Sequence, residues 1–225
     1  MISTVSSSST FTNSGNLRIM LVDDHAVVRM GFRLLLDTTA DLRVVAECSS
    51  GEEALARFAE INPDVMVLDL SMDGMGGLEA LSRILSKYPA ARVLVLSAHE
   101  DTSHPRRALA AGALGYLTKR SAADALIEAI RVVAARKMFL EPALAQEIAI
   151  EKISSPRSPV ETLTAREFEV FVMLARGKSV TEIAEMLFLS PRTIGTHLYN
   201  IKQKLGAGNA AELTLIAIRN GLIEA

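Results

Sequence analysis

The stretch Asp64-Val65-Met66-Val67-Leu68-Asp69-Leu70-Ser71-Met72 decides the fold of the first part of this 225-residue chain. Its apolar centre, residues 65–68, is too short for a helix and has no polar face, which is typical of a strand buried inside a parallel sheet. Alternating strands and helices predict an α/β fold with a doubly wound, five-stranded parallel sheet over residues 17–140. The other expected strands are residues 17–22, 42–46, 92–96 and 113–117, and the helical patterns are residues 27–36, 52–59, 78–86, 105–111 and 122–135.

The rest of the chain follows a different pattern. Residues 141–162 include a short helical stretch at residues 143–150 and the polar segment Ser154-Ser155-Pro156-Arg157-Ser158-Pro159, which suits a hinge. The Ser- and Thr-rich residues 1–16 cannot bury enough apolar surface to become ordered. We expect a flexible tail at 1–16, an α/β domain at 17–140, a linker at 141–162 and a small all-α domain at 163–225. The helical patterns of the last domain are residues 165–175, 180–187, 191–205 and 209–221.

Composition narrows the class of protein. Cys48 is the single cysteine, so no internal disulfide can form, and the chain suits a reducing cytoplasm. No apolar stretch approaches the ~18 residues that a membrane span needs, and the first residues lack the pattern of a secretory signal. The net charge of −2 says little, but no acidic residue lies between Glu185 and Glu212. A local basic face of this kind is a hint of nucleic-acid binding.

Polar side chains gather where the expected strands end. Asp23 and Asp24 follow the first strand, Asp69 the third and Ser97 the fourth, and Lys119 closes the fifth. The carboxyl ends of parallel strands meet at one edge of the sheet, where ligands bind in such folds. Singly, each residue has an ordinary explanation, because an Asp pair after a strand often forms a turn or a helix cap.

Together these residues form a set suited to phosphoryl transfer. Asp24 and Asp69, with a backbone carbonyl, supply hard oxygen ligands for Mg²⁺, and Asp23 adds charge and holds a metal-bound water. The Asp69 carboxylate would attack phosphorus in line, while Ser97 and Lys119 would donate hydrogen bonds to the phosphoryl group. Metal binding without phosphorylation is the simpler alternative, but it leaves Ser97 and Lys119 without a role.

Four segments resemble the receiver domain of two-component response regulators: Leu21-Val22-Asp23-Asp24-His25, Asp64 to Met72, Leu96-Ser97 and Gly115-Tyr116-Leu117-Thr118-Lys119. The resemblance covers residues 17–140 and implies a flavodoxin-like fold. It implies that Asp69 is the phosphoacceptor, that the Ser71 carbonyl is the third protein ligand to Mg²⁺, and that Ser97 and Tyr116 are the switch residues. In the family, the hydroxyl residue moves toward the phosphoryl group and the aromatic residue turns inward.

Two positions depart from the receiver pattern. Receivers usually have Pro four residues after the acceptor, where this chain has Asp73, and many have Pro after the lysine, where it has Arg120. The extra carboxylate of Asp73 could slow phosphorylation, alter the loop or strengthen metal attraction. Neither change removes a catalytic group, so we expect a functional site.

The pattern at residues 180–187 and 191–205 predicts two helices joined by the turn Phe188-Leu189-Ser190. Ser190 is the expected N-cap of the second helix, and Pro191 suits its first position. Apolar residues at helical spacing form one face of this helix, and the opposite face is polar, basic and free of acids. An ordinary amphipathic helix with a solvated face would show the same pattern. The residues of the polar face are Arg192, Thr193, Gly195, Thr196, Tyr199, Lys202 and Gln203.

The finer sequence resembles the LuxR-type helix-turn-helix, in the strings from Leu163 to Val170, Gly177 to Ala184 and Leu189 to His197, and in Lys204-Leu205. The resemblance implies phosphate contacts by Thr193, Lys202 and Lys204 and base contacts by Gly195, Thr196 and Tyr199. Gly195 is a departure, since Lys is common there, and it lowers helix propensity by ~1 kcal/mol. Ala210 is another, because Arg often precedes the Glu-Leu pair.

A receiver followed by this domain resembles the NarL/FixJ subfamily of response regulators. The resemblance implies a regulator that is not an enzyme in its own right, is phosphorylated by a sensor histidine kinase, and binds double-stranded DNA as a homodimer. The last helix could supply dimer contacts, although core packing explains its apolar residues equally well. Two rivals are an enzyme or metal-binding module that uses the acidic pocket, which leaves the helix-turn-helix unexplained, and a DNA-binding protein whose receiver is only a scaffold.

Overall fold

The computed structural model describes residues 16–99, 101–154 and 158–223. The expected flexible tail, apart from Asn16, and residues 155–157 of the expected hinge lie outside the described residues.

The first part of the chain forms a parallel sheet in the order β2-β1-β3-β4-β5-β6. Each of the five expected strands is present, and every neighbouring pair is parallel. The prediction of five strands missed a sixth, because β6 is only two residues long and too short to show a pattern. The strands are β1 (Leu17–Val22), β2 (Leu42–Cys48), β3 (Val65–Asp69), β4 (Val93–Ser97), β5 (Gly115–Thr118) and β6 (Phe139–Leu140).

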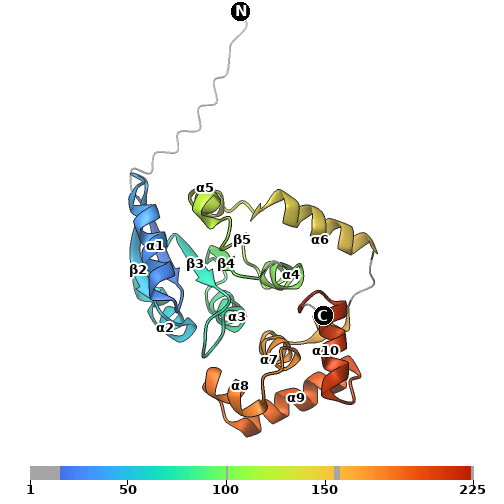
Figure 1. Cartoon of the computed structure of the whole chain (residues 1–225). Coiled ribbons are helices and arrows are strands. Elements are labelled where there is room, and N and C mark those ends of the chain that lie inside the picture. The colour runs from blue at the N-terminus through green and yellow to red at the C-terminus, as the bar shows by residue number, and fades with distance from the viewer. Residues whose placement is uncertain (1–15, 100, 155–157, 224–225) are drawn as a thin grey trace, which may run out of the picture.

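Helices cover both faces of this sheet, as the doubly wound prediction requires (Figure 1). Alternate residues of β1 divide between the faces: Ile19 and Leu21 pack in one apolar cluster with α1 and α5, and Met20 and Val22 in another with α2, α3 and α4. β3 and β4 are buried along their whole length, which explains why their sequences lack a polar face. The helices are α1 (Ala26–Asp37), α2 (Gly51–Ile61), α3 (Gly77–Lys87), α4 (Ser103–Ala110) and α5 (Ala122–Ala134).

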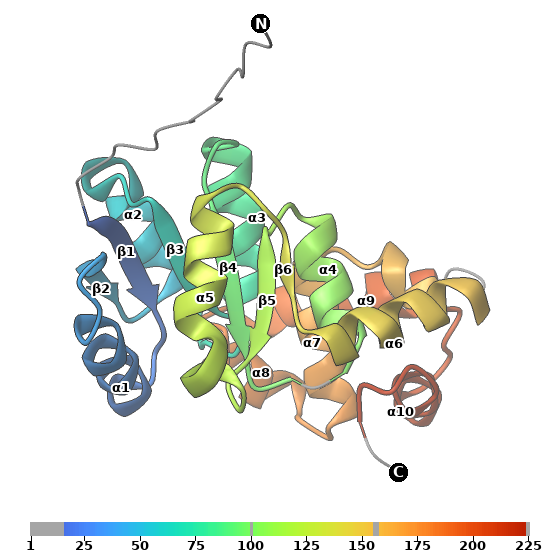
Figure 2. The ribbon, with the colours of Figure 1, turned by 90° about the horizontal axis from the view of Figure 1, so that it is seen from above.

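The remaining described elements are helical. The expected stretch at residues 143–150 is part of a longer helix, α6, which runs on from β6 at the edge of the sheet (Figure 2). α9 begins as predicted, because the Ser190 hydroxyl accepts a hydrogen bond from the Thr193 N–H and Pro191 is its first residue. The elements are α6 (Pro142–Ser154), the 3₁₀ turn η1 (Pro159–Thr162), α7 (Ala165–Ala175), α8 (Val180–Met186), α9 (Pro191–Leu205) and α10 (Ala210–Arg219).

The C-terminal helices pack against the sheet domain through α7, which lies beside α3 and α4, while α8 and α9 lie farther from the sheet (Figure 1). The apolar cluster beneath α2, α3 and α4 continues into the C-terminal part, where Phe168 and Phe171 of α7 are fully buried. Among the described helices, none combines the length and the apolar composition that crossing a bilayer demands.

Candidate functional sites

The acidic residues predicted from the strand ends lie together at one edge of the sheet. The Lys119 ammonium after β5 lies 2.8 Å from Asp23 Oδ2 and 2.7 Å from Asp69 Oδ2. Asp23 and Asp69 are both buried, and Lys119 is partly buried. The structure therefore brings the ends of β1, β3 and β5 to one pocket, as the sequence predicted.

Short local turns hold the two buried carboxylates. The His25 N–H donates to Asp23 Oδ1 at 2.8 Å, and the Ser71 N–H donates to Asp69 Oδ1 at 3.0 Å. In each case the acceptor lies two residues before the donor, which is the hydrogen bond of an Asx turn. One oxygen of each carboxylate is thereby fixed to the backbone, and the other faces Lys119.

Burial and charge oppose each other in this pocket. Burial raises the pKa of Asp69 by more than the neighbouring Lys119 ammonium lowers it. Burial alone would lower the pKa of Lys119, but the carboxylates of Asp23 and Asp69 outweigh it and the pKa is raised. Lys119 thus remains charged. A further cation placed beside Asp69 would stabilise the charged form of its carboxylate.

Asp24 completes a set of ligands that fits a divalent cation. Ligand atoms of Asp23, Asp24, His25 and Asp69 all lie within 4.8 Å of one another. Asp23 and Asp69 share the ammonium of Lys119, and Asp24 Oδ1 lies 2.6 Å from His25 Nδ1. The pocket thus holds three carboxylates and one lysine. Hard oxygen donors with excess negative charge are the ligands that Mg²⁺ prefers.

Asp73, the first departure from the receiver pattern, acts through its backbone. Its N–H donates to Asp24 Oδ2 at 3.1 Å, and its own side chain is exposed. A proline at this position has no N–H and could not make the bond. The departure therefore ties the loop after β3 to one of the expected metal ligands.

The predicted switch residues are connected through His99. The buried Ser97 hydroxyl accepts a hydrogen bond from the His99 N–H at 3.1 Å, and the Tyr116 hydroxyl donates to the His99 carbonyl at 3.1 Å. Tyr116 is fully buried, so its ring already has the inward position that the resemblance assigns to the activated state.

The polar face of α9 is exposed as predicted. Arg192, Gly195, Thr196 and Tyr199 are exposed, whereas Ile194 and Ile201 on the opposite face are fully buried. A Cβ added at Gly195 would meet no atom within 4 Å, so close packing within the chain does not require this glycine.

The three residues expected to contact DNA phosphates have partners within the chain. Lys204 Nζ lies 2.5 Å from Glu167, Lys202 Nζ donates to the Gly208 carbonyl at 3.1 Å, and the Thr193 hydroxyl bonds Ser190. A DNA phosphate would have to replace or share these bonds.

Sequence reasoning missed the contacts between the two parts of the chain. Arg166 of α7 donates to the carbonyls of Gly74 and Met75, in the loop after Asp69, at 2.9 and 3.2 Å. The Gly74 N–H donates to the Met186 carbonyl at 2.9 Å. Charged residues within the otherwise apolar α7 were the signal, since buried charges need partners.

A parallel sheet domain with an acidic pocket, followed by a helix-turn-helix, is the arrangement of the response regulators, and comparison with known proteins places this chain among them. Residues 19–131 match the response regulator receiver domain, and residues 161–217 match the luxR family of bacterial regulatory proteins. The chain belongs to the response regulators that combine these two domains, the NarL/FixJ subfamily.

Individual relatives agree with this assignment. The response regulator GacA of Pseudomonas viridiflava is 36% identical over 211 residues, covering 93% of this chain and 99% of that protein. The structure of a LuxR-family response regulator from Aurantimonas sp. SI85-9A1 is 40% identical, with a TM-score of 0.59, and covers 62% of this chain and 99% of that one. The structure of an RcsB–DNA complex is 26% identical, with a TM-score of 0.58, and covers 90% of this chain and 98% of that one.

Proposed function

We propose that this response regulator accepts a phosphoryl group on Asp69 and that phosphorylation changes its binding to DNA. The observation that carries the proposal is the position of Lys119, whose ammonium bridges Asp69 and Asp23 in a pocket shared with Asp24. A scaffold domain has no need of a partly buried lysine between carboxylates.

The residues present fit Mg²⁺, which would be held by Asp24, Asp69 and the Ser71 carbonyl, with Asp23 acting through a bound water. The ion would neutralise charge on the phosphoryl oxygens. A carboxylate oxygen of Asp69 attacks phosphorus as the bond to the donor breaks, giving an acyl phosphate. The donor is the phosphohistidine of a sensor kinase or a small acyl phosphate. Lys119 then turns to the new phosphoryl group, and the Ser97 hydroxyl donates a hydrogen bond to one of its oxygens.

A relay from the phosphoryl group to the DNA-binding part begins at Ser97. When the Ser97 hydroxyl moves to the phosphoryl oxygen, the hydrogen bond from the His99 N–H is lost. His99 also accepts from Tyr116, and its ring stacks on His104, which meets Phe168 of α7 edge-on with ring centres 5.0 Å apart. We propose that phosphorylation acts on α7 through this path, with Tyr116 already buried.

α9 is the proposed DNA-reading helix, and its polar face is exposed while α7 is docked on the receiver. Thr196 and Tyr199 would contact bases, and Gly195 would allow close approach. Thr193, Lys202 and Lys204 would contact phosphates, and Arg192 belongs to the same DNA-binding face. The structural neighbour RcsB was solved in complex with DNA, which supports DNA binding by this type of chain. Because docking leaves the reading face uncovered, we favour a switch that changes how two copies pair on DNA. A two-fold dimer would prefer a palindromic site.

The proposal includes a cytoplasmic location and no enzymatic activity other than phosphoryl acceptance. It keeps the predicted division into receiver (17–140), linker (141–162) and DNA-binding domain (163–225). The match to the receiver at residues 19–131 and to the luxR family at residues 161–217 supports this division.

The proposal is tested by measuring DNA affinity on a duplex whose binding site was selected in vitro from random sequences. We expect acetyl phosphate with Mg²⁺ to change the affinity for the selected duplex about tenfold or more in the wild type and to leave the affinity of Asp69→Asn unchanged. An equal response of the two proteins, or no response of either, would contradict the proposed switch.

A further inference from the structure

A second group of metal-ligating side chains lies outside the acidic pocket, where β4 leads into α4. Ligand atoms of His99, Asp101 and His104 all lie within 4.8 Å of one another. His104 is buried, Asp101 and His99 are partly buried, and His104 Nδ1 lies 2.6 Å from Asp101 Oδ2. The two imidazole rings stack with their centres 3.8 Å apart.

We propose that His99, Asp101 and His104 bind a divalent transition-metal ion, with Zn²⁺ as the preferred occupant. Two imidazoles and one carboxylate form a donor set suited to Zn²⁺, whereas Mg²⁺ prefers oxygen alone. Bonds of about 2.0–2.2 Å place neighbouring tetrahedral ligands about 3.3 Å apart. The ligand atoms already lie within 4.8 Å of one another. To bind one ion, the His104–Asp101 contact of 2.6 Å must open, and one imidazole must turn out of the nearly parallel stack so that both ring nitrogens point at the metal.

The local structure prepares these ligands. The other oxygen of Asp101 accepts hydrogen bonds from the N–H groups of Ser103 and His104, at 2.8 and 3.0 Å, which fixes the carboxylate at the start of α4.

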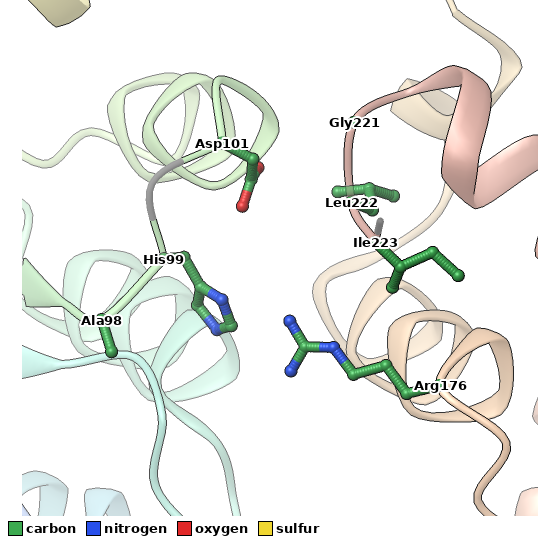
Figure 3. Close-up of a pocket in the computed structure, with 7 residues that line it drawn as sticks. All are labelled: Ala98, His99, Asp101, Arg176, Gly221, Leu222 and Ile223. Carbon is green, nitrogen blue, oxygen red and sulfur yellow. The ribbon is translucent and has the colours of Figure 1, made fainter. Parts of the chain in front are cut away.

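The site has room for a fourth ligand. His99 and Asp101 line a cavity of about 650 Å³ that lies between the receiver and the DNA-binding part, with Arg176, Leu222 and Ile223 on the opposite wall. Figure 3 shows the His99 ring directed into this cavity toward the Arg176 guanidinium. Three protein ligands and an open side are the arrangement of zinc sites that hold a water or an exogenous ligand.

The proposed site is connected to both switch residues. His99 bonds Ser97 through its N–H and Tyr116 through its carbonyl, and the His104 ring contacts Phe168 of α7. A bound ion would hold this loop in the arrangement seen here. If the phosphorylation proposed above occurs, the zinc-loaded protein should therefore take up phosphate more slowly, but metal binding itself does not depend on that function.

Metal binding is measured directly on the full chain, in excess Mg²⁺ to occupy the acidic pocket. The protein is titrated with Co²⁺, and the visible absorption spectrum reports the coordination geometry of the ion. Competition for Zn²⁺ with a chromogenic chelator gives the affinity for zinc. His99→Gln and Asp101→Asn remove ligands, and the asparagine retains an oxygen for the bonds to Ser103 and His104. His25→Gln is the matched control, since His25 belongs to the acidic pocket. Thermal unfolding of each variant checks that the fold is intact.

We expect one ion per chain with the absorption of a four- or five-coordinate Co²⁺ site and no thiolate charge-transfer band, since Cys48 is buried elsewhere. His99→Gln and Asp101→Asn should each weaken zinc binding at least about tenfold, and His25→Gln should not. Absence of binding in the folded wild type, retention in folded His99→Gln, or loss in His25→Gln would overturn the proposal.

Discussion

Arg107 of the receiver lies over Phe168 of the DNA-binding part, with its guanidinium carbon 4.0 Å from the centre of the ring. The same guanidinium donates to the carbonyls of Leu163, at 2.9 Å, and Val160. Burial lowers the pKa of Arg107 to about 10, so the side chain is still charged at neutral pH. One receiver side chain therefore holds the start of α7 by a cation–π contact and two charge-assisted hydrogen bonds.

Removing this contact should release the DNA-binding part. Arg107→Ala loses the stacking and both bonds, which together stabilise docking by about 2–4 kcal/mol. We expect a larger radius of gyration by small-angle X-ray scattering with little change in receiver stability. Arg131→Ala is the control, because it breaks only an exposed ion pair with Asp41. Equal scattering curves for Arg107→Ala and the control would contradict the role given to Arg107.

Docking should weaken as pH rises, because Glu169 of α7 is partly buried against the receiver. A side chain at Gly76, where φ is +73°, would collide with the Glu169 carboxylate. Burial raises the pKa of Glu169 to about 7, despite the opposing Arg166 at 3.0 Å. The negative charge of Glu79 also raises the pKa of Glu169, whereas a hydrogen bond with the Glu79 backbone lowers it.

When α7 is docked on the receiver (the closed state), Glu169 binds a proton that it releases when α7 undocks (the open state). Docking free energy should be greatest at low pH and should fall between about pH 5 and pH 7, then level off. Energy transfer between one dye on the receiver and one on the DNA-binding part measures the docked fraction at each pH. Glu169→Gln should stay docked from about pH 5 to pH 8. A pH dependence that persists in Glu169→Gln would assign the titration to another group.

Mg²⁺ should raise the thermal midpoint of the receiver transition. Binding to the native state alone stabilises it by RT ln(1 + [Mg²⁺]/Kd). Asp24→Asn removes a proposed ligand and should abolish the increase, whereas Asp73→Asn retains the backbone bond to Asp24 and should preserve it. Scanning calorimetry with and without Mg²⁺ measures the thermal midpoint of each variant. If Mg²⁺ raises the midpoint of Asp24→Asn as much as that of the wild type, Asp24 is not a ligand.

The two kinds of DNA contact proposed for α9 should separate in salt titrations. Thr196→Ala should weaken the free energy of binding to the selected site by about 1–3 kcal/mol and leave binding to unrelated DNA unchanged. Lys202→Ala should weaken both and reduce the slope of log K against log salt by about one. Fluorescence anisotropy on the two duplexes measures these effects, and equal losses on both duplexes for Thr196→Ala would make it a phosphate contact.

The sheet and its acidic pocket could be predicted because their signals are local. Apolar runs such as residues 65–68 mark buried strands, and parallel strands place Asp23, Asp69 and Lys119 at one edge regardless of loop detail. The capping of α9 by Ser190 is local in the same way.

Contacts between the two parts of the chain could not be predicted. Arg107 and Phe168 meet only because α7 docks beside α3 and α4, and no local pattern determines that docking. We did not predict the group of His99, Asp101 and His104 from the sequence, because its ligand atoms come together only through the way the chain enters α4.

Phosphorylation of Asp69 is the central claim, and intact mass spectrometry tests it most directly. The wild type and Asp69→Asn are incubated with acetyl phosphate, with and without Mg²⁺. The account predicts a gain of one phosphate in the wild type that requires Mg²⁺ and is absent from Asp69→Asn. A wild type that gains no phosphate, from acetyl phosphate or from a partner kinase, or an Asp69→Asn protein that gains one, would contradict it.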